Sequence, residues 1–312
     1  MSKTAFLGFG EVNTPKEIII NKCKKAEESL LNKGLELISV YPITDDYEEK
    51  DINNAIDRLT GQDFDSIVVC IAGWIPTHAV VKVTECFREK PMVLWGLCGR
   101  TEGDRLVTTA DQAGTTALRK TFYDLGYAFK YVYDIVGLES KTDKVVSYVK
   151  AARAAKKLRR AKAGMAGYRD MNLYGTLYDG GSLKREIGAE IETFEMLEIE
   201  QRYQKITDAQ KQAVIDNCMS KWNFVKPANP ESMKMAAGYY LAVKEICDER
   251  GYDAVSLKDV DGMKKLLGFP PAPIFMLLAD EAGLCTIPEN DSLGNITQLM
   301  VKYLTGQCAF YL

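Results

Sequence analysis

The first half of the chain alternates short apolar segments with longer amphipathic ones, and no other feature constrains the fold as strongly. Residues 66–72 are apolar without interruption, which is typical of a strand buried on both faces. Strands are predicted at residues 4–9, 35–41, 66–72, 92–97 and 129–133, with helices between them and a long helix at 142–162. This alternation predicts an open parallel sheet with helices on both faces.

The second half repeats the alternation less regularly. Strands are predicted at residues 163–168, 190–194 and 254–257, and helices at 182–187, 208–222, 231–250, 272–282 and 293–304. Because 312 residues exceed one ordinary core, we predict an α/β protein of two doubly wound, flavodoxin-like (Rossmann-like) parallel-sheet domains in tandem. The basic end of the helix at 142–162 marks the boundary, which gives an N-terminal domain at 1–163 and a middle domain at 164–312.

Composition narrows the classes of function. Hydrophobic residues make up 46% and charged residues 27%, which are globular values, and the net charge of −3 favours neither nucleic acid nor an anionic membrane as a partner. The longest apolar run, at 274–279, is far shorter than the roughly 20 residues of a membrane span. The first strand has no secretory signal before it, and the eight cysteines form no CxxC pair, so we expect a cytoplasmic protein with reduced, buried thiols.

The first predicted strand ends in two glycines, Gly8 and Gly10, but the third glycine of a dinucleotide fingerprint is missing. We therefore favour a plain tight turn, and a nucleotide-dependent enzyme using this loop stays open as an alternative. Residues 14–17 (TPKE) predict a capping box that starts the first helix from Thr14.

Two further loops follow predicted strands, where open α/β sheets place their ligands. Residues 72–78 offer Trp74, a flat face for a sugar ring, and His78, the single histidine of the chain. Residues 97–105 form a polar loop with Arg100. These three are the candidate substrate-binding residues. The alternative for each is structural: Trp74 packs under its loop, His78 lies on the surface, and Arg100 pairs with a nearby acid. One histidine also excludes a zinc site built from this chain alone.

Residues 279–297 allow two interpretations. The simpler one is a helix that stops at Gly283, a buried link, and a new helix capped by Asp291 or Ser292. The other rests on residues 278–283 (LADEAG) and 289–294 (ENDSLG), followed by a glycine turn at 305–307. In these motifs the chain resembles the L-fucose/L-arabinose isomerase family, and the order of elements is similar over its whole length.

The resemblance implies an aldose–ketose isomerase in which Glu289 is both catalytic base and metal ligand, with Mn²⁺ stabilising the ene-diolate. It also implies a monosaccharide substrate and a homo-oligomer with sites between chains. Two departures stand out. Pro288 replaces a cysteine or small residue, and the family's second acid and histidine would follow Leu312, in a C-terminal domain that the sequence does not include.

The chain ends in an apolar, strand-like run at 308–312, which predicts a truncated chain or a partner that covers this end. We therefore expect an isomerase that is incomplete as given. The alternative is a non-catalytic sugar-binding or regulatory module of two domains, since two sheets can bind a sugar without chemistry.

Overall fold

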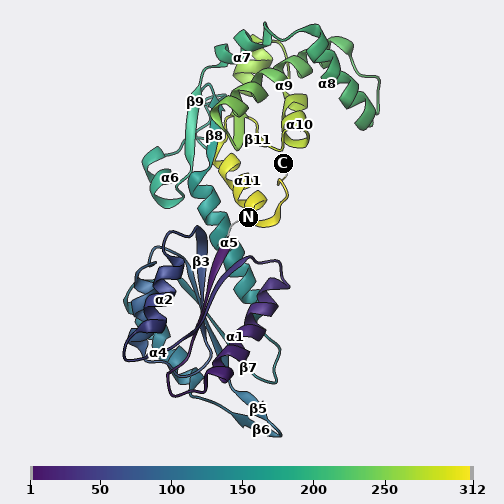
Figure 1. Cartoon of the computed structure of the whole chain (residues 1–312). Helices are drawn as coiled ribbons and strands as arrows, with labels where there is room; N and C mark the ends of the chain where they lie inside the picture. Colours follow the sequence, from purple (N-terminus) through teal and green to yellow (C-terminus); the bar gives the residue numbers. More distant parts are fainter. Residues whose placement is uncertain (1–2, 310–312) are drawn as a thin grey trace. The chain divides into compact units, whose positions relative to one another are not determined.

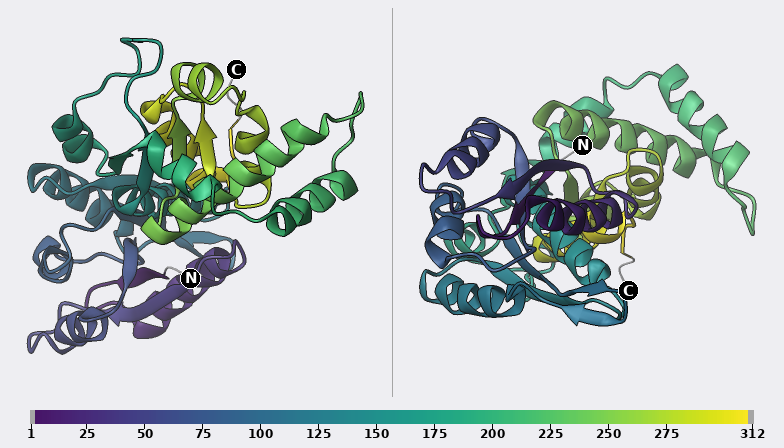
Figure 2. Two further views of the ribbon diagram at one scale, coloured as in Figure 1. Left: turned by 90° about the horizontal axis from the view of Figure 1, so that it is seen from above. Right: turned by 60° about the horizontal axis from the view of Figure 1, so that its bottom comes forward.

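The structure is a computed structural model that describes residues 3–309 (Figures 1 and 2). The chain divides into two compact units, unit 1 at Met1–Arg153 and unit 2 at Ala154–Leu312. The division lies within the basic helix α5 (Thr142–Arg160), the element from which the sequence predicts the boundary.

Unit 1 is built on a five-stranded parallel sheet of order β2-β1-β3-β4-β7. Its strands are β1 (Lys3–Phe9), β2 (Leu37–Ile43), β3 (Phe64–Ile71), β4 (Met92–Cys98) and β7 (Phe129–Ile135). A short antiparallel hairpin, β5 (Arg100–Glu102) and β6 (Arg105–Val107), follows β4 and was not predicted. The parallel sheet and its flavodoxin-like order confirm the predicted fold class.

Helices cover both faces of this sheet. α1 (Lys16–Leu31) and α5 pack on one face, and α2 (Lys50–Leu59), α3 (Thr77–Glu85) and α4 (Asp111–Asp124) on the other. Neighbouring residues of β3 enter different cores: Val68 and Cys70 pack with α1, while Val69 packs with the opposite helices. The whole of β3 is buried, as the uninterrupted apolar run predicts.

Unit 2 repeats the plan with a four-stranded parallel sheet of order β11-β10-β8-β9. Its strands are β8 (Lys162–Ala166), β9 (Glu190–Phe194), β10 (Ala254–Leu257) and β11 (Cys285–Ile287). Its helices are α6 (Gly180–Glu186), α7 (Met196–Tyr203), α8 (Asp208–Lys221), α9 (Pro230–Arg250), α10 (Ala272–Asp280), α11 (Ser292–Thr305) and the π-helix η1 (Asp259–Lys264). The sequence analysis missed α7, η1 and β11.

The structure bears on three local expectations from the sequence. The capping box at Thr14 is wrong, because Pro15 occupies the N-cap of α1 and no side chain caps the helix. Gly8 serves close packing, since a Cβ there would lie 2.3 Å from Cys23 Sγ on α1. The strand predicted at 308–312 falls partly on residues 310–312, outside the described residues.

Within residues 3–309, no helix combines the length and apolar character that crossing a bilayer requires.

Candidate functional site

The carboxyl ends of β1 and β3 are neighbours in unit 1, and helices leave them toward opposite faces of the sheet. Such a switch point is the usual ligand crevice of an open α/β sheet. Here main-chain bonds tie its loops together: Glu11 N–H donates to Trp74 O at 2.6 Å, and Trp74 N–H donates to Thr109 O at 2.8 Å. The loops that the sequence singled out are therefore held in one arrangement.

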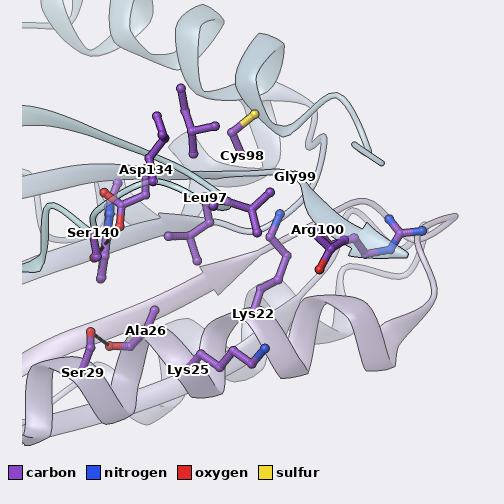
Figure 3. Close-up of a pocket in the computed structure, with 16 residues that line it drawn as sticks. Lys22, Lys25, Ala26, Ser29, Leu97, Cys98, Gly99, Arg100, Asp134 and Ser140 are labelled. Carbon is purple, nitrogen blue, oxygen red and sulfur yellow. Dashed lines mark hydrogen bonds between the residues drawn. The ribbon is translucent and has the colours of Figure 1, made fainter. Parts of the chain in front are cut away.

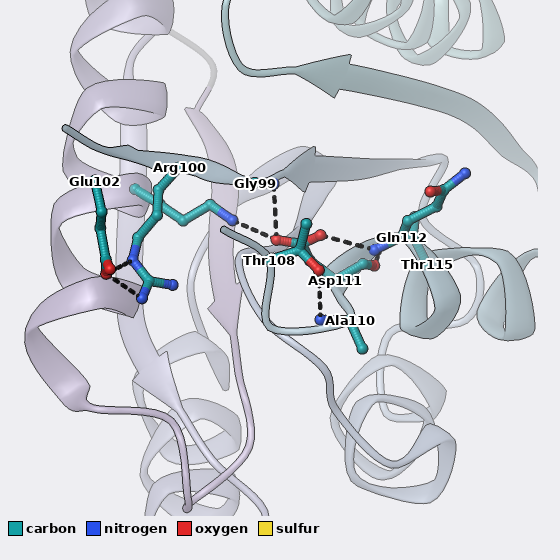
Figure 4. Close-up of polar contacts among 9 residues, drawn as sticks. Gly99, Arg100, Glu102, Thr108, Ala110, Asp111, Gln112 and Thr115 are labelled. Carbon is teal, nitrogen blue, oxygen red and sulfur yellow. Dashed lines mark hydrogen bonds and ion pairs between the residues drawn. The ribbon is translucent and has the colours of Figure 1, made fainter. Parts of the chain in front are cut away.

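The structure places the three predicted substrate-binding residues of unit 1 in different settings. Trp74 is half-buried, and its ring lies against Gly114 of α4. His78 is exposed in the first turn of α3. Arg100 begins β5, and its Nε donates to Glu102 Oε1 at 2.9 Å (Figure 4). Each of the three residues thus has the surroundings that its structural alternative predicts. Their roles in binding a substrate stay predictions.

A cavity of about 430 Å³ opens between α1 and the carboxyl ends of β4 and β7 (Figure 3). We name it the α1 cavity. Its polar lining comprises Lys22, Lys25, Ser29, Arg100, Thr101, Asp134 and Ser140, and its apolar lining includes Trp95, Leu97, Val136 and Leu138. Of the predicted site residues only Arg100 lies here. The lining residues at 97–101 lie in the loop at 97–105, which the sequence analysis singled out. The lining from α1 and β7 was missed, although Asp134 stands at a strand end, where ligands are expected.

A buried ion pair fixes one wall of the α1 cavity. Asp111 is 1% exposed, and its Oδ2 accepts Lys22 Nζ at 2.7 Å and Gly99 N–H at 3.0 Å (Figure 4). The pair joins α1 to the start of α4 across 89 residues of sequence. Asp111 is buried and the Lys22 side chain is only 13% exposed, so the contact holds Lys22 in one place.

Hydrogen bonds also fix the Asp134 end of the cavity. Asp134 accepts the Ser140 hydroxyl at 2.6 Å and Lys141 N–H at 2.8 Å. Thr142 lies within hydrogen-bond distance of both Ser140 (2.8 Å) and Ser29 (3.1 Å), which links the end of β7 to α1. These bonds orient the Asp134 carboxylate and use part of its capacity to accept hydrogen bonds.

Two donors of the α1 cavity lack partners. Trp95 is 1% exposed, yet its indole Nε1–H has no acceptor. Lys25 is exposed on α1 and forms no ion pair or hydrogen bond with any residue in the range 3–309. The buried, unpaired donor of Trp95 costs free energy, whereas water solvates the exposed Lys25.

Glu289, the predicted base and metal ligand, lies in unit 2 between β11 and α11. Its backbone has a positive φ of 62°, followed by 54° at Asn290. The buried Asn290 amide donates to Ala166 O at 2.9 Å and to Tyr168 O at 2.5 Å, which anchors this turn on the loop after β8. The Glu289 carboxylate is half-buried and has no hydrogen bond or ion pair with the described part of the chain.

Asp291 caps α11 by accepting Gly294 N–H at 3.0 Å, as the simpler interpretation of this segment predicts. In residues 3–309 no group of three or more His, Cys, Asp or Glu side chains is arranged to hold a metal. The roles of Glu289 and Mn²⁺ therefore stay predictions.

Unit 2 also contains a carboxylate cluster around Asp170 that the sequence analysis did not assemble. Asp170, fully buried after β8, accepts the backbone N–H groups of Met171 (3.0 Å), Val260 (2.8 Å) and Asp261 (2.9 Å). Burial, and then a hydrogen bond with Asp170, raise the pKa of Asp259 above its usual value. The geometry is that of a clamp between the β8 loop and η1.

No family model and no curated protein matches the chain. One solved structure that matches is a periplasmic solute-binding protein of an ABC transporter from Actinobacillus succinogenes 130z, with bound D-allose. The match covers 100% of this chain and 96% of that chain, with 18% identity and a TM-score of 0.24. A likeness this distant does not argue for what the present chain binds.

These findings correct the main functional prediction, the aldose–ketose isomerase. No isomerase model matches, and the solved structure reported above is described as a solute-binding protein. Glu289 itself belongs to no group of three or more His, Cys, Asp or Glu side chains that could hold a metal among residues 3–309.

Proposed function

We propose that the chain is a non-catalytic binding module that holds a small polar ligand, a monosaccharide or a close derivative, in the α1 cavity of unit 1. The observation that carries this proposal is the unpartnered indole N–H of the buried Trp95 in the lining of a cavity of about 430 Å³. A volume of roughly 300–1,000 Å³ is usual for small-molecule sites.

The lining suits a sugar, which has hydroxyl groups around its edge and C–H groups on its faces. Leu97 and Val136 supply apolar surface, Asp134 supplies an oriented acceptor, and Trp95 and Lys25 supply donors. Lys22 and Asp134 are both held by neighbours within the protein. Fixed groups of this kind favour selective binding, because little order must be imposed when the ligand arrives.

Calorimetric titration of a panel of neutral and acidic monosaccharides, in the presence of a chelator, tests this proposal. Saturable, metal-independent binding is expected. The Trp95→Phe variant removes the N–H and retains most of the ring, so its affinity should fall by about tenfold, which corresponds to one lost hydrogen bond. Trp74→Phe is the matched control, because Trp74 lies outside the cavity lining.

The proposal fails if no sugar of the panel binds, or if both tryptophan variants bind as the wild type does. Cytoplasmic localisation and a homo-oligomeric state remain predictions beside it, and sedimentation of the purified chain tests the second.

A further inference from the structure

We propose that the ligand of the α1 cavity carries an anionic group, a carboxylate or a phosphate, which binds at Lys25. This inference rests on the proposed function and specifies its ligand. It depends on the hydrogen-bonding groups that remain free in the cavity and on the position of its charges.

The free groups are donors. An indole N–H can only donate, and so can a lysine ammonium. Trp95 Nε1 is buried without a partner, and Lys25 has none among residues 3–309. The one carboxylate of the lining, Asp134, already accepts Ser140 and Lys141. A ligand that satisfies these donors must therefore bring acceptors.

The charges of the cavity lining also favour an anionic ligand. Three cations line the cavity, namely Lys22, Lys25 and Arg100. Asp111 balances Lys22, and Glu102 balances Arg100. Lys25 is the lining cation that lacks a counter-ion within the described residues. Figure 3 shows Lys25 on α1, apart from the Asp134–Ser140 pair, so an anion at Lys25 avoids the carboxylate.

Carboxylates and phosphates satisfy such donors better than a hydroxyl does. A hydrogen bond between an ammonium and an anion is shorter than a bond between neutral groups and roughly twice as strong. Because Lys25 is exposed, salt will screen part of this gain.

Three ligands with the same ring test the inference: D-glucose, D-glucuronate and D-glucose 6-phosphate, titrated by calorimetry at low and high salt. We expect at least one anionic ligand to bind about tenfold more tightly than glucose at low salt, with a smaller advantage at high salt. Comparison of the two anions distinguishes a carboxylate site from a phosphate site.

Variants on α1 complete the design. Lys25→Met should reduce the affinity for the anion to that for glucose, and Lys25→Arg should restore most of it. Lys24→Met is the matched control, since Lys24 is an exposed neighbour outside the cavity lining. Equal affinity for all three ligands, or an unchanged anion affinity in Lys25→Met, overturns this inference and leaves the proposed function standing. Absence of binding by all three overturns this inference, and absence of binding by the whole panel overturns the proposed function as well.

Discussion

The Lys22–Asp111 pair offers a strict test of how the α1 cavity is built. Asp111→Asn keeps an acceptor for Gly99 N–H but removes the charge that faces Lys22 at 2.7 Å. The Lys22 side chain is only 13% exposed, so its ammonium would remain largely buried without a counter-ion. Breaking a buried pair in this way costs about 3–5 kcal/mol. We therefore expect the free energy of unfolding of unit 1 to fall by about that amount.

Urea denaturation followed by tryptophan fluorescence measures this change. Asp124→Asn is the control, because it breaks an exposed i,i+4 pair with Lys120 and should alter stability by no more than about 0.5 kcal/mol. The double variant Lys22→Met/Asp111→Asn should recover much of the loss, since neither buried charge remains and Gly99 N–H keeps an acceptor. A loss below about 1 kcal/mol in Asp111→Asn would refute the reasoning that this pair is a buried, fixed wall of the cavity.

Three further predictions concern unit 2 and the thiols. Asp170→Ala leaves three backbone N–H groups without their acceptor and should destabilise unit 2 by about 3 kcal/mol or more; a change within error in thermal or urea unfolding argues against the clamp. The raised pKa of Asp259 means that folding favours its protonated form, so its contribution to stability falls as pH rises above its usual value of 3.8. Asp259→Asn should therefore gain stability relative to wild type at neutral pH and not at acid pH, and the same difference at both would contradict this. A thiol-titrating reagent should modify Cys86 and Cys308 quickly and the six buried cysteines only on unfolding, and rapid modification of more than two thiols would show the cores to be more open.

The sequence predicts the sheets well, because their signals are local. The uninterrupted apolar run of β3 indicates burial on both faces, and both faces are packed. Asp291 before α11 is a typical N-cap residue, and it caps the helix. These features need no knowledge of distant residues.

The cavity could not be predicted in the same way, because it depends on contacts between distant segments. Lys22 and Asp111 are 89 residues apart in sequence, and nothing in either neighbourhood indicates that they meet. Asp170 likewise clamps a segment 90 residues away. The sequence motif pointed to Glu289 as the functional residue of its loop. In the structure the neighbouring Asn290 makes the contacts that hold this loop. The resemblance of this motif to an isomerase family correctly located a turn at Glu289 but led to the wrong main function, an aldose–ketose isomerase.

The indole N–H resonance of Trp95 tests the central claim most directly, because the chain has only three tryptophans, Trp74, Trp95 and Trp222. Addition of a ligand that binds in the α1 cavity should shift the Trp95 indole signal in a nitrogen–proton NMR spectrum, while the Trp74 and Trp222 signals stay in place. A saturating ligand that leaves the Trp95 signal unmoved would contradict the account.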